Sequence, residues 1–428
     1  MKNSNKNAYY MTIIGVLFFI FGFVTWLNNV LIPFLKLACE LTDFQAWWVT
    51  SAFYIAYFFM AIPSSYVLNK TGYSKGISLG LIIIMVGSLI FIPAATSRSY
   101  FVFLIALFTQ GVGLSLLQTA ANPYVTILGP IESAARRMSI MGICNKVAGM
   151  IGILLLSSLL FGGTSHIIEE INVFKNLEES GIILNANQLI EKTALLDQLA
   201  RNVIIPYIVM AVILFILAIM VNFSKLPNIE IEESEEVKSS SKPIYKYPYM
   251  ILGVIALFFY VGVEVIAIDS LNLYGQELGY TIDQSKYFGT ASLVALTIGY
   301  LLAIVLIPKY IDQRKALIFQ TCLAIILVIA AVLLKGLPSI ICVVLLSFTH
   351  AIMWPAIWPL SLDGLGSHTK LASAFLIMAI AGGAILPPIY GALADVFTRQ
   401  TAYWIMIPCY LIILFFAVYG WKIGRNKV

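Results

Sequence analysis

Charged side chains are scarce in this sequence. Only 11% of its 428 residues are Asp, Glu, Lys or Arg, whereas a soluble globular protein carries about a quarter. Hydrophobic residues make up 60% of the chain, and most of them fall into blocks of about 20 residues, the length that crosses a bilayer. The composition therefore excludes an ordinary soluble protein and predicts an all-α membrane protein embedded in a lipid bilayer.

The sequence also lacks the usual signs of an enzyme, a metal site or a nucleic-acid-binding protein. Its five cysteines are scattered without paired spacing, so we expect neither a disulfide framework nor a zinc site. No nucleotide-binding loop and no nucleophile–base set is present. The net charge of +5 is spread over short loops instead of forming a basic patch. We predict no enzymatic activity, no cofactor and no nucleic-acid partner.

Twelve hydrophobic blocks are candidate membrane helices. They cover residues 11–35, 46–68, 76–95, 100–128, 139–161, 202–223, 247–274, 286–308, 315–334, 338–362, 370–392 and 401–421. The first block follows Lys2 and Lys6 and is too long for the apolar region of a signal peptide, so we expect it to be the first span. With the N-terminus inside, the inner segments hold 17 Lys and Arg residues and the outer segments hold 8. This asymmetry predicts twelve spans with both termini cytoplasmic. We expect a monomeric, multi-pass protein of a bacterial-type inner (plasma) membrane.

Two longer segments interrupt the series of blocks. Residues 162–201 are predicted to lie outside, where Asn187 can cap a helix and four leucines share one side: Leu189, Leu195, Leu196 and Leu199. We expect this amphipathic helix to lie at the outer membrane interface. Residues 224–246 carry five Glu, a serine run and four Lys, a composition typical of a solvated linker. It divides the chain into two predicted six-helix bundles, residues 1–223 and 247–428.

The two predicted bundles resemble each other in sequence. Segments 68–75 and 308–315 are both short basic turns after a span. Asn122-Pro123 near the end of the fourth span has a counterpart in Trp358-Pro359 of the tenth span, and this alignment places Trp354 opposite Gln118. A duplicated six-helix unit is typical of secondary transporters whose binding site lies at the midplane between the two halves.

Polar and aromatic residues inside three spans are candidate sugar ligands. Gln118 and Asn122 lie one turn apart on a helix, and amides both donate to and accept from hydroxyl groups. Asn28 and Asn29 are adjacent and diverge by about 100°, so we expect only one of them to face the cavity. In the tenth span His350, Trp354 and Trp358 form one stripe, and aromatic faces bind pyranose rings. The alternative for all of them is helix–helix packing.

Three formal charges lie within predicted spans, where charge is costly and often functional. They are Lys146 in the fifth span and Glu264 and Asp269 in the seventh. The two acids lie about 140° apart around a helix, so one can line the cavity while the other meets a neighbour such as Lys146. Either acid could couple transport to an ion, or the charges could form a fixed pair that orders the bundle. We expect Lys146 to have a structural or gating role.

A cluster of charges is predicted on the cytoplasmic side, after the fourth span. Glu132, Arg136 and Arg137 could form an ion-pair latch there, or could simply be solvated.

The motifs resemble those of the fucose:proton symporter family of the major facilitator superfamily, close to its glucose/galactose transporter branch. The matching segments are 27–33, 44–46, 51–54, 118–130 and 260–265, and the similarity covers nearly all the spans. The resemblance implies twelve helices in two pseudo-symmetric bundles, a central sugar site and alternating access. In the L-fucose permease pattern, acids occupy the places that Asn29 and Gln118 hold here.

These two departures shape the functional prediction, because an amide can bind a sugar but cannot carry a proton near neutral pH. A coupling acid would then be Glu264 or Asp269. We predict a permease that imports a neutral hexose, with glucose or galactose ahead of fucose or N-acetylhexosamine, driven by an H⁺ or Na⁺ gradient. A sugar uniporter remains the main alternative. A non-transporting sugar sensor and a membrane enzyme fit the sequence less well.

Overall fold

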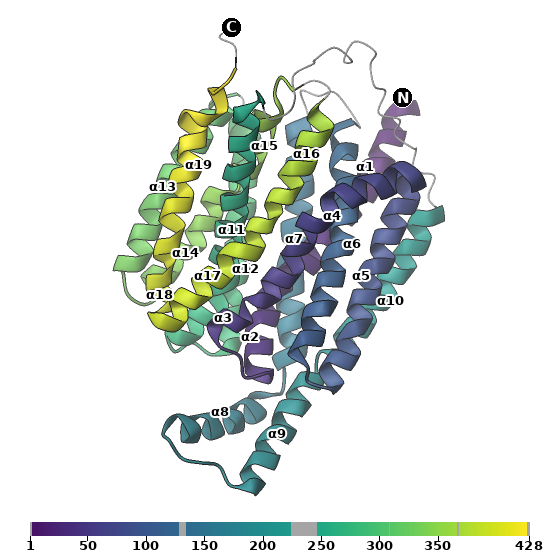
Figure 1. The fold of residues 1–428 in the computed structure, drawn as a ribbon. Coiled ribbons are helices and arrows are strands. Elements are labelled where there is room, and N and C mark those ends of the chain that lie inside the picture. Colours follow the sequence, from purple (N-terminus) through teal and green to yellow (C-terminus); the bar gives the residue numbers. More distant parts are fainter. Residues whose placement is uncertain (1, 128–133, 224–245, 308, 366–367, 426–428) are drawn as a thin grey trace.

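The structure is a computed structural model that describes residues 2–127, 134–223, 246–307, 309–365 and 368–425 as a bundle of long helices (Figure 1). Twelve helical segments in this described part are long and apolar enough to cross a membrane, which confirms the predicted number of spans and the fold class. The predicted linker at 224–246 lies almost entirely outside the described residues. The division into two bundles at that linker therefore stays a prediction.

Ten helices make up the first half of the chain. They are α1 (Lys2–Trp26), α2 (Asn28–Ala38), α3 (Asp43–Ala46), α4 (Trp48–Thr71), α5 (Tyr73–Thr96), α6 (Tyr100–Ile127), α7 (Ala134–Phe161), α8 (Ser165–Glu179), α9 (Ala186–Arg201) and α10 (Ile204–Phe223). The start of α1 and the end of the last helix, α19, lie at one end of the bundle, whereas α8 and α9 lie at the other (Figure 1). We call these the terminal end and the α8/α9 end.

The second half begins with α11 (Pro248–Glu277), the longest helix, whose middle is buried on all sides. It continues with α12 (Ile282–Leu306), α13 (Gln313–Leu333), α14 (Leu337–His350), α15 (Met353–Leu362), α16 (Thr369–Met378), η5 (Ala379–Ala381), α17 (Gly382–Val396), α18 (Arg399–Ala402), η6 (Tyr403–Ile405), α19 (Met406–Val418) and η7 (Gly420–Lys422). The halves meet where α7 packs on α12, α4 on α17 and α2 on α11.

Several of the described spans are interrupted, among them the first, the tenth and the eleventh. The first changes from α1 to α2 at Leu27, the tenth changes from α14 to α15 after His350, and the eleventh contains the 3₁₀ turn η5. Interrupted helices expose backbone groups and turn side chains inward, and transporters use them to build binding sites. In the first span the break lies between Trp26 and Asn28, so Asn28 and Asn29 do not continue the helix faces of α1.

The segment at 162–201 forms two helices, of which only the second was predicted. The N-cap of α9 is Asn185, not Asn187, because Asn185 and Gln188 form a reciprocal capping box. Figure 1 shows α9 projecting from the bundle in line with α10, so it does not lie flat across the membrane face as expected. Buried Lys192 ties α9 to the bundle through Glu40 (2.5 Å), and to α8 through Glu178 (2.7 Å).

A second set of contacts joins the two halves at the α8/α9 end. The carboxylate of Asp395 on α17 accepts hydrogen bonds from the backbone N–H groups of Asp43 and Phe44, both at 2.8 Å, and so caps α3 from the opposite half. Arg399 on α18 forms ion pairs with Asp43 (2.8 Å) and with Glu277 (2.9 Å). We call Asp43, Asp395 and Arg399 the α3 clasp. The sequence analysis predicted none of the three.

Candidate functional site

A buried ion pair joins the two halves in the middle of the bundle. The Nζ atom of Lys146 on α7 lies 3.3 Å from Oε1 of Glu264 on α11, and the two side chains are only 9% and 11% exposed. Lys146 also lies 4.2 Å from the centre of the Trp26 ring, a cation–π contact with α1. The opposite charges offset each other's desolvation cost, which neither could bear alone in a membrane interior.

The indole of Trp26 connects this pair to a residue that the sequence analysis missed. Trp26 Nε1 donates to Oδ1 of Asn145 at 3.1 Å. Helices α1 and α7 approach closely here because Gly22 has no side chain, and a Cβ atom at that position would collide with the Asn145 backbone. Asn145 could have been identified from the sequence as an amide inside a span, directly before the intramembrane lysine.

Gln118 lies on α6, partly exposed, and donates from Nε2 to the hydroxyl of Tyr57 on α4 at 3.0 Å. Tyr57 lies beside Tyr54, with ring centres 6.2 Å apart and planes nearly parallel at 27°. Neither tyrosine was predicted as a site residue, because an aromatic side chain in a membrane span is usually interpreted as a packing residue. The side chain of Asn122 lies outside the described part, so its predicted place beside Gln118 stays a prediction.

The tryptophans of the tenth span form a flat aromatic surface. Trp354 and Trp358 on α15 stack with ring centres 5.2 Å apart and an interplanar angle of 21°, and both are only partly buried. Trp354 also lies 6.4 Å from the ring of Tyr260, which is one turn before Glu264 on α11. His350 does not share this surface, because it is fully buried and its Nε2 atom lies 2.7 Å from the Tyr410 hydroxyl.

These side chains form two groups of contacts, Gln118 with Tyr57 on one side and the residues around the Lys146–Glu264 pair on the other, and we call the two groups together the central cluster. Its members come from α1, α4, α6, α7, α11 and α15, so both halves contribute: Trp26, Tyr57, Gln118, Asn145, Lys146, Tyr260, Glu264, Trp354 and Trp358. The cluster combines one neutralised ion pair, amides that can bind hydroxyl groups, and aromatic faces. This combination suits a neutral, polyhydroxylated ligand with an apolar face.

A second polar group lies where α2 packs on α11. Asn29 donates from Nδ2 to the carbonyl oxygen of Ile268 at 2.8 Å, and Asn272 donates to the carbonyl of Asn29 at 3.4 Å. Asp269 is 1% exposed, and Asn28 is also buried. Asn28 and Asn29 are therefore both buried, and the expectation that only one of them faces the cavity stays a prediction.

The predicted latch cannot be placed in full. Glu132 and the side chain of Arg136 lie outside the described residues, and Arg137 is partly exposed at the start of α7. The latch therefore stays a prediction.

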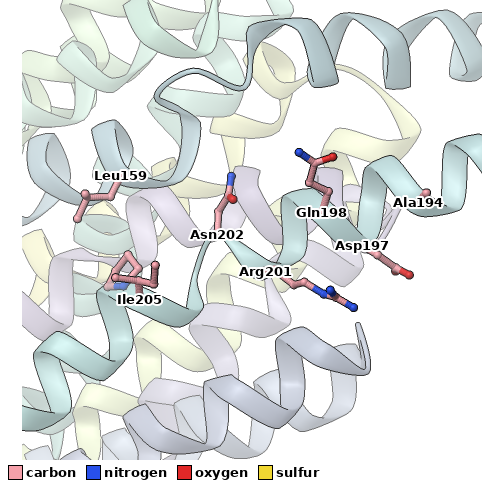
Figure 2. Close-up of a pocket in the computed structure, with 8 residues that line it drawn as sticks. Leu159, Ala194, Asp197, Gln198, Arg201, Asn202 and Ile205 are labelled. Carbon is pink, nitrogen blue, oxygen red and sulfur yellow. The ribbon is translucent and has the colours of Figure 1, made fainter.

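A cavity of about 620 Å³ lies away from the central cluster, between the end of α7 and the α9–α10 junction (Figure 2). Its polar lining includes Asp197, Gln198, Arg201 and Asn202, and its apolar lining includes Ile205, whose side chain is exposed. This cavity is peripheral and receives side chains from the first half only, so we do not assign it to the ligand. Within the described part, no group of three or more His, Cys, Asp or Glu side chains could hold a metal ion.

Comparisons with known proteins bear on the class of protein and on its fold. A model of the Major Facilitator Superfamily matches residues 14–381. A glucose/galactose transporter of Brucella abortus biovar 1 (strain 9-941) is 33% identical, over 98% of this chain and 96% of its own. The L-fucose-proton symporter of Escherichia coli (strain K12) is 29% identical over 96% of this chain and 92% of its own.

The solved structures give the same result for the fold. A crystal structure of the Escherichia coli fucose:proton symporter superposes with a TM-score of 0.71 at 27% identity, covering 97% of this chain and 98% of that one.

Proposed function

This chain belongs to the Major Facilitator Superfamily, and from that premise we propose that it is a secondary transporter that imports a neutral hexose by cation-coupled symport. The observation that carries the proposal is the central cluster, in which both halves bring amides, aromatic rings and a neutralised ion pair together at mid-span. The full-length similarity to a glucose/galactose transporter supports a hexose, with glucose or galactose ahead of fucose or N-acetylhexosamine.

In this proposal, Gln118 and Asn122 bind sugar hydroxyls and the Trp354–Trp358 surface receives the apolar face of the pyranose. Asn28 and Asn29 belong to the same binding wall through the break in the first span. Lys146 holds Glu264 in place across the interface between the halves. No chemical step is involved, so the work of the protein is to bind, to occlude and to change conformation.

The protein is proposed to lie in a bacterial-type inner membrane as a monomer, with the terminal end in the cytoplasm and the α8/α9 end outside. The distribution of basic residues supports this orientation. In that orientation the α3 clasp closes the outer end, so the structure represents a state sealed toward the outside. Alternating access then requires the clasp to open and re-form once in each transport cycle.

The experiment is uptake into proteoliposomes that contain the purified protein. Labelled glucose, galactose, fucose and N-acetylglucosamine are tested with an imposed pH gradient, with an imposed Na⁺ gradient and with no gradient. We expect one hexose to accumulate above its external concentration under one of the gradients. Equilibration without accumulation identifies a uniporter, and failure to transport any sugar of the panel contradicts the proposal.

A further inference from the structure

The two acids of α11 have very different surroundings. Glu264 has a cationic partner, Lys146, at 3.3 Å. Asp269 lies five residues further along, is 1% exposed, and forms no ion pair among the described residues; its Oδ1 atom has no hydrogen-bond partner there. We propose that Asp269, beside the amide of Asn29, is the site that binds the coupling cation, a proton or a sodium ion. This proposal rests on the proposed function.

Acceptor atoms without a donor lie at the contact between α2 and α11. The Oδ1 atom of Asn29, like that of Asp269, is buried without a hydrogen-bond donor. Asn29 donates from Nδ2 to the Ile268 carbonyl, and its side chain also interacts with Asp269. Its amide lies against Gly289 of α12, where a Cβ atom would leave no room for it. Buried polar atoms are rarely left unpaired, because each costs free energy comparable to a lost hydrogen bond. Oxygens that only accept can be satisfied together by a proton or a metal cation, and not by a further acceptor.

Among the residues that the structure describes, no cationic side chain forms an ion pair with Asp269. The titratable groups that interact with it electrostatically are Glu264 on the same helix and Tyr54 on α4, and neither supplies a positive charge. Its neighbour on α2 is the uncharged amide of Asn29. An unpaired carboxylate in a membrane interior is costly unless it is neutralised. Lys146 already neutralises Glu264, so Asp269 is the acid of α11 that can bind a cation.

The position of Asp269 also links the cation to the conformational change. The α2–α11 contact joins the first half to the second, through Asn29 to Ile268 and Asn272 to Asn29. A cation bound between Asp269 and the Asn29 amide would hold the two helices together, and its release would leave an unneutralised carboxylate at their contact. Binding therefore favours one arrangement of the halves over the other, which is the condition for coupling.

The test separates sugar exchange from sugar accumulation in proteoliposomes. Asp269→Asn keeps the shape of the side chain and removes the charge, so we expect exchange of labelled hexose within about threefold of wild type and an accumulation ratio that falls to about one under both gradients. Glu264→Gln leaves Lys146 without a partner and should reduce exchange and accumulation together. Asp283→Asn, a change of an exposed carboxylate at the start of α12, is the control and should leave both the exchange rate and the accumulation ratio unchanged.

Several results would overturn the assignment. Normal accumulation by Asp269→Asn would do so, as would loss of accumulation with retained exchange in Glu264→Gln. If Asp269→Asn abolishes exchange as well, Asp269→Glu is measured instead, and we expect its half-maximal pH or Na⁺ concentration for accumulation to shift by at least about threefold; an unchanged midpoint rejects the site. The gradient that drives wild-type accumulation identifies the ion. If wild-type protein transports no hexose at all, the proposed function has failed and not the cation site.

Discussion

Replacing Arg399 by glutamine should shift the protein toward a state open at the α8/α9 end. Arg399 is the cation of the α3 clasp, and its ion pair with Asp43 at 2.8 Å crosses between the halves. Its second ion pair, with Glu277 at 2.9 Å, stays within the second half. Arg399→Gln removes both pairs, whereas Glu277→Gln removes only the pair that does not cross. The two variants therefore isolate the contribution of the crossing pair.

The magnitude follows from how far the pair is buried. The side chains of Arg399 and Asp43 are 17% and 8% exposed. Exposed ion pairs contribute about 0–1 kcal/mol, and breaking a fully buried pair costs about 3–5 kcal/mol. This pair lies between the two cases, so we expect its loss to favour the open state by about 1–3 kcal/mol, a factor of about 5–150 in the population ratio. Asp43 keeps its contact with Lys36 at 2.5 Å, and Asp395 keeps its backbone hydrogen bonds, so the clasp is weakened and not abolished.

Double electron–electron resonance measures this shift directly. Spin labels are attached at Phe44→Cys and Phe397→Cys, two exposed positions on opposite halves, in a background without the five native cysteines. We expect one short distance in the parent protein and a second, longer distance in Arg399→Gln. Glu277→Gln should resemble the parent. If Arg399→Gln shows no more of the longer distance than Glu277→Gln does, the crossing ion pair does not hold the outer end closed.

Three further predictions concern other parts of the molecule. Gln118→Ala should raise the KM for hexose uptake about tenfold, the equivalent of one lost hydrogen bond, while Tyr57→Phe should change it less; an unchanged KM in Gln118→Ala would mean that Gln118 only packs. Lys192→Met should loosen the α8–α9 hairpin, because Lys192 bridges the hairpin to the end of α2. Amide hydrogen exchange across 165–201 should then become faster, while exchange in α13 stays unchanged. Burial raises the pKa of the Cys39 thiol to about 11, so its maleimide labelling rate should keep rising about tenfold per pH unit up to pH 10, whereas a thiol of ordinary pKa levels off above about pH 9.

Hydropathy and charge predicted the membrane helices well, because the bilayer imposes one length and one composition on every span. The predicted fifth span at 139–161 and the observed segment Ser139–Phe161 coincide. Helix α8 was missed because its composition is mixed and only two of its residues, Ile171 and Phe174, are buried. The N-cap of α9 was displaced by two residues because Asn185 and Asn187 are the same residue type, and only the capping box with Gln188 decides between them.

Side-chain partners were the part that the sequence could not provide. Formal charges inside spans stand out as costly, so Lys146, Glu264 and Asp269 could be identified, but spacing on one helix cannot say which acid meets the lysine. The answer depends on how α7 packs on the second half, which is a tertiary property. Tyr57 and Asn145 gave no distinctive pattern, and the α3 clasp joins residues more than 350 positions apart in the chain.

The cap on α3 has a consequence for folding as well as for sealing. Helix α3 contains only four residues, and a helix of that length is not stable by itself in water. Its first backbone N–H groups are satisfied by Asp395, which belongs to the opposite half of the chain. When the halves separate at that end, α3 loses this cap and keeps only its own capping box of Thr42 and Gln45. Each transport cycle would then include the fraying and re-formation of one helical turn, so that local order at residues 43–46 reports which side of the membrane is open.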